Sequence, residues 1–123
     1  MIGGPSASTR ATQRLADFAA GVEFTDLPPA VVAALKTMLL DTIGCSLAAT
    51  GLDAGSRILA DFALAQGGKA EATIIGARTK VPAAEAAFVN GALAHALNYD
   101  PIGPSAGHTG VVCLAAPLAA AEA

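Results

Sequence analysis

The sequence predicts an all-α, multihelical fold of about five helices, with at most one short extended segment. Apolar residues recur at intervals of three and four along most of the chain, which is the spacing of one helix face. Start and stop signals made of Asp, Pro and Gly bracket these stretches. The chain also contains 31 alanines, and small side chains let helix axes approach closely without leaving voids. Together these observations indicate helices packed on helices.

The composition limits the chain to at most one domain and excludes one class of partner. Its 123 residues can form one modest core. Hydrophobic residues make up 54% and charged residues only 14%, whereas ordinary domains are about one quarter charged. We therefore expect much of the surface to meet another subunit, or the chain to be part of a larger body. The net charge of −3, without a basic cluster, argues against a nucleic-acid partner.

The two cysteines and the apolar runs bear on the cellular location of the protein. Cys45 and Cys113 each lie inside an apolar run and form no CxxC motif, so we expect buried thiols in a reducing compartment. The longest uncharged run, residues 101–121, is interrupted by Pro, Gly and His, and the first residues lack an apolar signal core. The sequence thus predicts no membrane segment and a cytoplasmic location.

The first half of the chain contains two predicted helices after a flexible tail at residues 1–7. The first helix covers residues 8–21 and is amphipathic, with Leu15 and Phe18 on its apolar face and Arg14 and Asp17 facing outward. The stretch TDLPP at residues 25–29 is a helix-start signal with proline in the first turn. The second helix then runs to about Ala49, and Thr50-Gly51 ends it. A broad apolar stripe predicts that this helix lies in the core; it comprises Val32, Leu35, Leu39, Ile43 and Leu47.

The second half contains three further helices and one short extended segment. Asp53 caps a helix that reaches about Gln66, with Gly67-Gly68 as its terminator. Residues 72–76, ATIIG, form an extended segment or an edge strand for which the sequence offers no evident partner. A fourth helix covers residues 82–97. The last begins near His108 and is still running when the chain stops, an ending that we interpret as a cut.

The polar residues most suited to chemistry gather in residues 90–110, NGALAHALNYDPIGPSAGHTG. A helical run ends there, a loop carries Asn98 and Asp100, and His108 then opens the last helix. A histidine at a helix start, with a carboxylate eight residues upstream, can serve as a base directed into a pocket.

Four stretches together carry a family resemblance. They are LLDTIGCSLAATG (39–51), ATIIG (72–76), VPAAEAAFVNGALAHALNYD (81–100) and GHTGVV (107–112). In this order they resemble the 2-methylcitrate dehydratase family, also called MmgE/PrpD, and the resemblance covers residues 9–123. It implies that residues 8–123 are the N-terminal portion of a helical domain, within a larger dimeric subunit that also has a smaller α/β domain. Family members include 2-methylcitrate dehydratase, cis-aconitate decarboxylase and iminodisuccinate epimerase, which act at a carbon next to a carboxylate without a required metal or organic cofactor.

The resemblance assigns roles only at matching positions. His108 falls on the active-site histidine that ends the family's Asp-rich loop, and Asp100 matches the second aspartate of that loop. Asn98 stands where decarboxylase-like members have the first aspartate, which removes a charge from the pocket. Pro101 and Ile102 replace an aspartate and a threonine. The family's later active-site lysines, histidine and tyrosines would lie beyond residue 123.

The chemistry common to the family can also be argued from the residues. Removing a weakly acidic C–H proton next to a carboxylate needs a neutral base, and a helix N-terminus disfavours imidazolium at His108. Asp100 can orient this imidazole. The N–H groups around Thr109 attract a substrate carboxylate, and we expect Thr109, Asn98 and Ser105 to bind substrate. The nearest cation in sequence is Lys80, so the rest of the anion site must come from elsewhere.

Each of these residues also has a plainer structural interpretation. His108 can be a simple helix cap, and Asp100-Pro101 is a common turn starter. His95 falls on the helix face of Phe88 and Ala92 and is expected to be a core histidine. Asn90-Gly91 is expected to be a close helix contact and Cys113 core filler. A metal site formed by His95, Asp100 and His108 lacks a recognisable ligand spacing, so no metal is expected.

The sequence therefore predicts the N-terminal fragment of a hydro-lyase resembling 2-methylcitrate dehydratase, with His108 and Asp100 as catalytic residues. Its expected partners are a small di- or tricarboxylate substrate and either a second copy of the chain or a complementing C-terminal half. Two alternatives remain open. One is an epimerase or decarboxylase of the same family, and the other is a non-catalytic truncated or split subunit that acts as an assembly partner.

Overall fold

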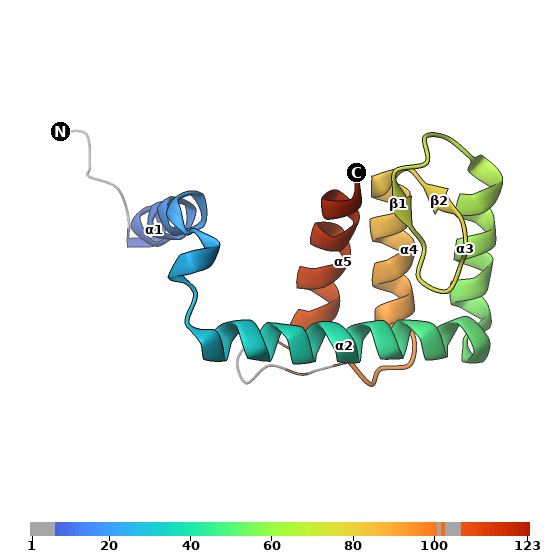
Figure 1. Cartoon of the computed structure of the whole chain (residues 1–123), viewed down its shortest axis with the longest axis horizontal. Coiled ribbons are helices and arrows are strands. Elements are labelled where there is room, and N and C mark those ends of the chain that lie inside the picture. The colour runs from blue at the N-terminus through green and yellow to red at the C-terminus, as the bar shows by residue number, and fades with distance from the viewer. Residues whose placement is uncertain (1–6, 101, 103–106) are drawn as a thin grey trace. The chain divides into compact units, whose positions relative to one another are not determined.

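A computed structural model describes residues 7–100, 102 and 107–123 (Figure 1). Five α-helices account for most of it: α1 (Ala7–Gly21), α2 (Pro29–Leu52), α3 (Ala54–Gln66), α4 (Ala83–His95) and α5 (Thr109–Glu122). Their lengths of 15, 24, 13, 13 and 14 residues exceed half of the chain, so the all-α prediction is confirmed. A 3₁₀ turn η1 (Phe24–Asp26) and two short strands complete the described elements.

The chain divides into two compact units, Met1–Ala34 and Leu35–Ala123. In the first unit, α1 begins at Ala7, the last residue of the predicted tail, and residues 1–6 of that tail lie outside the described residues. The turn η1 is closed by a hydrogen bond from the backbone N–H of Glu23 to the carboxylate of Asp26, 2.9 Å long. Leu15 and Phe18, expected on the apolar face of α1, are exposed.

In the second unit, α4 lies between α3 and α5. The part of α2 that belongs to this unit runs along the ends of these helices (Figure 1). Small side chains make this packing close, as predicted from the alanine content. A Cβ atom on Gly91 of α4 would lie 3.8 Å from the Cβ of Ala115 in α5, which confirms a close helix contact at this glycine. The core cluster consists of Ala49, Ala63, Ala72, Ile74, Val81, Ala86, Val89, Leu93 and Ala119.

Helix α2 is long and apolar enough to cross a membrane by length and composition alone, with a mean hydropathy of 1.5. It also carries Lys36 and Asp41. Three of its residues, Thr42, Ser46 and Ala49, are buried in this chain, and Ala49 belongs to the core of the second unit. The predicted apolar stripe, however, is not in the core: none of its five residues is buried in this chain, and Leu35 and Leu47 are exposed, so that prediction is wrong for this chain. Helix α2 continues through the predicted Thr50-Gly51 stop to Leu52, because the following residue, Asp53, caps the next helix.

The helix ends follow the signals in the sequence closely. The carboxylate of Asp53 accepts a 2.6 Å hydrogen bond from the backbone N–H of Ser56, as a helix N-cap does. Gly67 ends α3 at a φ of 66°, a left-handed conformation in which glycine has no steric penalty. Pro82 precedes α4, which ends at His95 rather than at the predicted residue 97. That earlier end matters for the functional site.

The extended segment has a partner strand, which the sequence interpretation missed. Strand β1 (Ala72–Thr73) pairs antiparallel with β2 (Lys80–Val81), with Ala72 opposite Val81. The expectation that no partner exists was therefore wrong. The partner has only two residues before Pro82, too few to show the alternating pattern from which strands are predicted.

Asn90 fixes this hairpin to α4. Its side-chain oxygen accepts a hydrogen bond from the backbone N–H of Ile75 at 2.8 Å, and its amide nitrogen donates to the carbonyl of Thr73 at 2.9 Å. Asn90 is buried, so its amide replaces water for both backbone groups. The Asn90-Gly91 pair thus combines a clamp on the hairpin with a close helix contact.

Replacing Asn90 with alanine should lower the free energy of unfolding by roughly 2–6 kcal/mol, because two backbone groups lose their partners at about 1–3 kcal/mol each. Urea unfolding followed by circular dichroism measures this. Gln66→Ala removes the same amide from an exposed position at the end of α3 and should change stability little. Equal effects of the two substitutions would contradict the clamp.

Candidate active site

Three polar side chains meet where α4 ends and α5 begins. His95 is the last residue of α4, Asp100 lies in the loop that follows, and His108 is the N-cap residue of α5. The Nδ1 atom of His95 lies 2.9 Å from Oδ1 of Asp100, and the Nδ1 atom of His108 lies 2.8 Å from Oδ2. The two imidazole rings are in edge-to-face contact, with centroids 4.6 Å apart. One carboxylate thus holds two histidines, and we call these three residues the His–Asp–His cluster.

The backbone at the end of α4 positions the cluster. The N–H of Asn98 donates to the carbonyl of His95 at 2.9 Å, which closes a turn directly after the helix. Asn98 itself has a φ of 55°, a left-handed conformation that asparagine tolerates better than most residues. This reversal directs the chain back so that Asp100 reaches the ring of His95. The close packing of α4 against α5 then places His108 beside the same carboxylate.

The carboxylate of Asp100 is fully buried, with 0% of its side chain exposed. Burial acts to raise the pKa of Asp100, but the hydrogen bonds from His95 and His108 outweigh it and hold that pKa below the ordinary value of 3.8. Asp100 is therefore ionised at neutral pH. No lysine or arginine among the described residues forms an ion pair with it, so the only cationic partners it can have there are the two histidines.

The ionised state of Asp100 sets the tautomer of both histidines. A carboxylate can only accept hydrogen bonds, so both Nδ1 atoms must carry a proton and donate it. In a neutral imidazole the other ring nitrogen, Nε2, then holds a free lone pair. A histidine oriented in this way by a carboxylate is suited to take a proton from a substrate. The ring of His108 is 30% exposed and remains accessible from solvent.

Helix α2 flanks the cluster. The pKa of the Cys45 thiol is raised by partial burial and then by the negative charges of Asp41 and Asp100, which places Cys45 within electrostatic reach of the cluster. Cys113 was predicted to be core filler, but it is exposed. Helix α5 packs through Gly110, Ala115 and Ala119, and Cys113 lies off that face.

The other predicted site residues are Asn98, Ser105 and Thr109, which follow α4 in the sequence. Thr109 is the first residue of α5 and is half-buried, and Asn98 is exposed. Ser105 lies outside the described residues, so its predicted role in substrate binding is untested. The alternative role of His108 was a simple helix cap. In the structure the ring of His108 hydrogen-bonds Asp100 and makes no capping hydrogen bond to the described backbone of α5.

His95 was expected to be a core histidine, and that prediction is wrong. Its side chain is 51% exposed, and its ring is held by Asp100 at the surface end of α4. Helical periodicity placed it with Phe88 and Ala92 on one face, but the helix ends at His95 and the following turn brings a carboxylate to its ring. The signal that could have found this contact is the five-residue spacing from His95 to Asp100 across a helix end.

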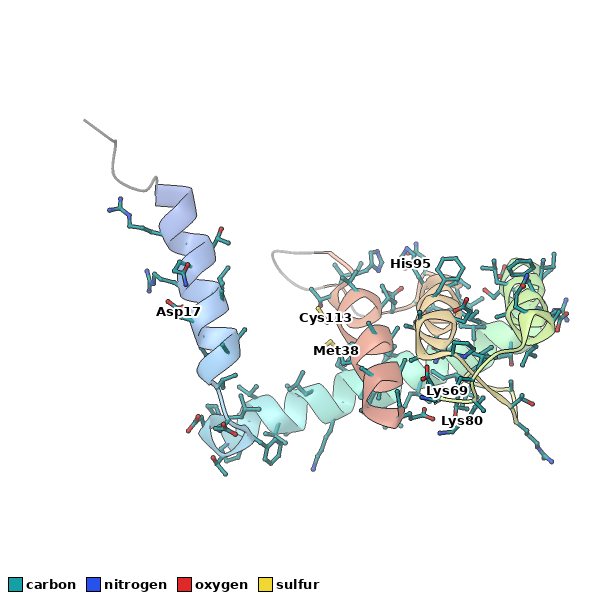
Figure 2. All side chains as sticks on the ribbon, turned by 90° about the horizontal axis from the view of Figure 1, so that it is seen from above. Asp17, Met38, Lys69, Lys80, His95 and Cys113 are labelled. Atoms are coloured by element: carbon teal, nitrogen blue, oxygen red, sulfur yellow. The ribbon has the colours of Figure 1, made fainter. Side chains whose placement is uncertain are left out.

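Two described lysines, Lys69 and Lys80, lie away from the cluster (Figure 2). Lys80 pairs with Glu122 at 3.1 Å, and Lys69 pairs with Glu71 at 2.8 Å. Glu122 is the last residue of α5, and His108 immediately precedes the first residue of this helix. At 1.5 Å per residue, the helix therefore separates Glu122 from His108 by about 20 Å. Figure 2 shows Lys69 and Lys80 away from His95. The groups that would bind a substrate carboxylate through charge are thus not supplied by these two lysines.

The family model described as the MmgE/PrpD N-terminal domain matches residues 13–123. No curated protein and no solved structure matches the chain at a significant level.

Proposed function

The chain belongs to the MmgE/PrpD family over residues 13–123, and on this premise we propose that it supplies the proton-transfer group of a hydro-lyase resembling 2-methylcitrate dehydratase. The substrate is a small di- or tricarboxylate, and the reaction removes water across a carbon–carbon bond. The proposal agrees with what the resemblance implies for the family, whose members act at a carbon next to a carboxylate. Proton transfer of this kind needs no organic cofactor and fits a cytoplasmic enzyme.

The observation that carries the proposal is the pair of hydrogen bonds to Asp100. They leave Nε2 of His108 free to take the C–H proton. As that bond breaks, its electrons form the carbon–carbon double bond, and the hydroxyl group on the next carbon leaves as water after receiving a proton from an acid. Asp100 stabilises the imidazolium that forms on His108. The free N–H groups at the start of α5, around Thr109, favour a carboxylate of the substrate.

The rest of the active site must come from another segment or subunit. A tricarboxylate needs cationic partners, and the two lysines with described ion pairs are engaged elsewhere in the second unit. We propose that a C-terminal half of the family type, or a second copy of the subunit, brings them next to His108. Such an arrangement also covers exposed apolar side chains such as Phe62 and Phe88.

Two other functions remain candidates, each supported by a specific observation. Epimerisation and decarboxylation use the same base, but Asn98 stands where decarboxylase-like members have an aspartate, so the loss of this charge favours epimerisation over decarboxylation of cis-aconitate. A non-catalytic assembly role is supported by the hollow between α3 and α4, which is lined largely by apolar residues and flanked by the exposed Phe62 and Phe88. An assembly partner would bind a C-terminal half without giving it activity.

The proposal can be tested with a chimaera in which this chain replaces the N-terminal domain of an active lyase of the family. We expect it to dehydrate 2-methylcitrate, whereas residues 1–123 alone should show no measurable dehydration of 2-methylcitrate or decarboxylation of cis-aconitate. The measurement is product formation followed by absorbance of the new double bond, with the unmodified lyase as reference. A folded chimaera that turns over cis-aconitate or iminodisuccinate instead would favour the corresponding alternative. Robust turnover by the lone chain would show that the active site is misplaced.

A further inference from the structure

The proposed reaction uses His108 and Asp100 but gives no role to His95, although all three side chains meet. One potential ligand atom from each of the three residues lies within 4.8 Å of the other two. We propose that the His–Asp–His cluster binds a divalent transition-metal ion of the zinc type, through one ring nitrogen of each histidine and the carboxylate of Asp100. This inference goes beyond the proposed function and does not depend on it.

The donor set selects the class of metal. Two imidazoles and one carboxylate suit Zn²⁺, Co²⁺ or Ni²⁺, whereas Mg²⁺ and Ca²⁺ prefer oxygen ligands. Three protein ligands with a fourth position left to water is a common arrangement for accessible zinc sites. The exposure of the two rings, 51% for His95 and 30% for His108, leaves a path for the ion and its water.

The distances fit a metal after a small adjustment. Ligand atoms at about 2.0–2.2 Å from a tetrahedral zinc lie roughly 3.3 Å from one another. The two Nδ1–carboxylate distances, 2.9 and 2.8 Å, are shorter than this by about half an ångström. His95 ends α4, and His108 directly precedes α5, so small rotations of two partly exposed rings can open this space without moving the helices.

Charge also favours the ion. The carboxylate of Asp100 is fully buried, and among the described residues its charged partners are two histidines, which are positive only when protonated. A buried charge is stable when it is paired or bound to a metal. A divalent ion supplies a fixed positive charge at this position, where no described lysine or arginine forms an ion pair.

Metal binding and proton abstraction exclude each other at His108. If the ion takes Nε2, the base has no free lone pair. If the ion binds Nδ1, the ring proton moves to Nε2, and again no nitrogen of His108 is free to accept a proton. The ion is therefore an inhibitor of any reaction that uses His108 as a base.

The test uses the 123-residue chain without a histidine tag, titrated with Co²⁺ and followed by the visible absorption of the bound ion. We expect one Co²⁺ per chain, displaced by one Zn²⁺ and not by excess Mg²⁺. His95→Gln should weaken binding at least tenfold, and because His95 is half exposed this variant should fold normally by circular dichroism. Glu85→Gln, a change of a carboxylate on α4 away from the cluster, serves as the control and should bind as the parent does.

Two results would overturn the proposal. One is a folded chain that gives no Co²⁺ absorption at a stoichiometric concentration of the ion. The other is binding that His95→Gln leaves intact but that Cys45→Ser or Cys113→Ser abolishes, which would assign the metal to a thiol. Neither result bears on the dehydratase proposal, which the chimaera tests separately.

Discussion

Asp100→Asn in the active chimaera should reduce turnover of 2-methylcitrate at least a hundredfold, within the range of about 10²–10⁴ that general acid–base catalysis contributes. The reason lies in the two hydrogen bonds that the carboxylate accepts. An asparagine amide has one oxygen acceptor, and its NH₂ group can only donate. One of the two rings must then leave Nδ1 unprotonated and carry its proton on Nε2, or else lose its hydrogen bond. In addition, the neutral amide no longer stabilises the positive charge that forms on His108 when it takes the proton, whichever ring is affected.

The same substitution has a pH signature in stability. Because the fold holds the pKa of Asp100 below its ordinary value of 3.8, the stabilisation by its ionised form is complete above that value and is lost as pH falls through the folded pKa. Urea unfolding at pH 7 should show a loss of about 1–3 kcal/mol for Asp100→Asn, and the difference from wild type should shrink below pH 3.8.

Asp41→Asn is the matched control for both measurements. Asp41 is an exposed aspartate of α2 that also acts on the Cys45 thiol, and no described hydrogen bond joins it to the His–Asp–His cluster. We expect it to leave turnover and stability nearly unchanged. If Asp100→Asn behaves like Asp41→Asn, Asp100 is a turn residue and does not organise the histidines.

The helices could be predicted from the sequence because their signals are local. Asp53 and Pro29 mark helix starts through their own side chains, and Gly67 marks an end through its left-handed backbone. The predicted placement of His108 at a helix start is confirmed for the same reason. The family resemblance, which rests on several separated stretches, is confirmed by the match over residues 13–123.

What could not be predicted depends on contacts across the ends of elements. The strand partner of β1 has two residues, too short for a periodic signal. The contact of His95 with Asp100 depends on where α4 ends and on the left-handed Asn98, neither of which periodicity specifies. Cys113 lies in an apolar run, but α5 packs through its smaller residues, so the thiol is exposed. The roles of the site residues in substrate binding and catalysis stay predictions.

The central claim is that His108 is the base, and its substitution should have the largest effect. Asparagine at position 108 roughly keeps the size of the side chain and a hydrogen-bond donor, but it removes the nitrogen that accepts a proton. In the chimaera, His108→Asn should therefore lower turnover at least a hundredfold. His95→Asn makes the same chemical change to the other ring bound to Asp100 and should lower turnover less than tenfold, because in this account His95 only helps to hold the carboxylate.

The most direct measurement is the rate of 2-methylcitrate dehydration by the chimaera carrying His108→Asn, relative to the parent chimaera at saturating substrate. Circular dichroism and unfolding curves must first show that both proteins are equally folded. We expect a rate at least a hundredfold below that of the parent, with the His95→Asn rate within tenfold of the parent rate. A His108→Asn rate equal to the parent rate would contradict the account and reduce His108 to a structural residue at the start of α5.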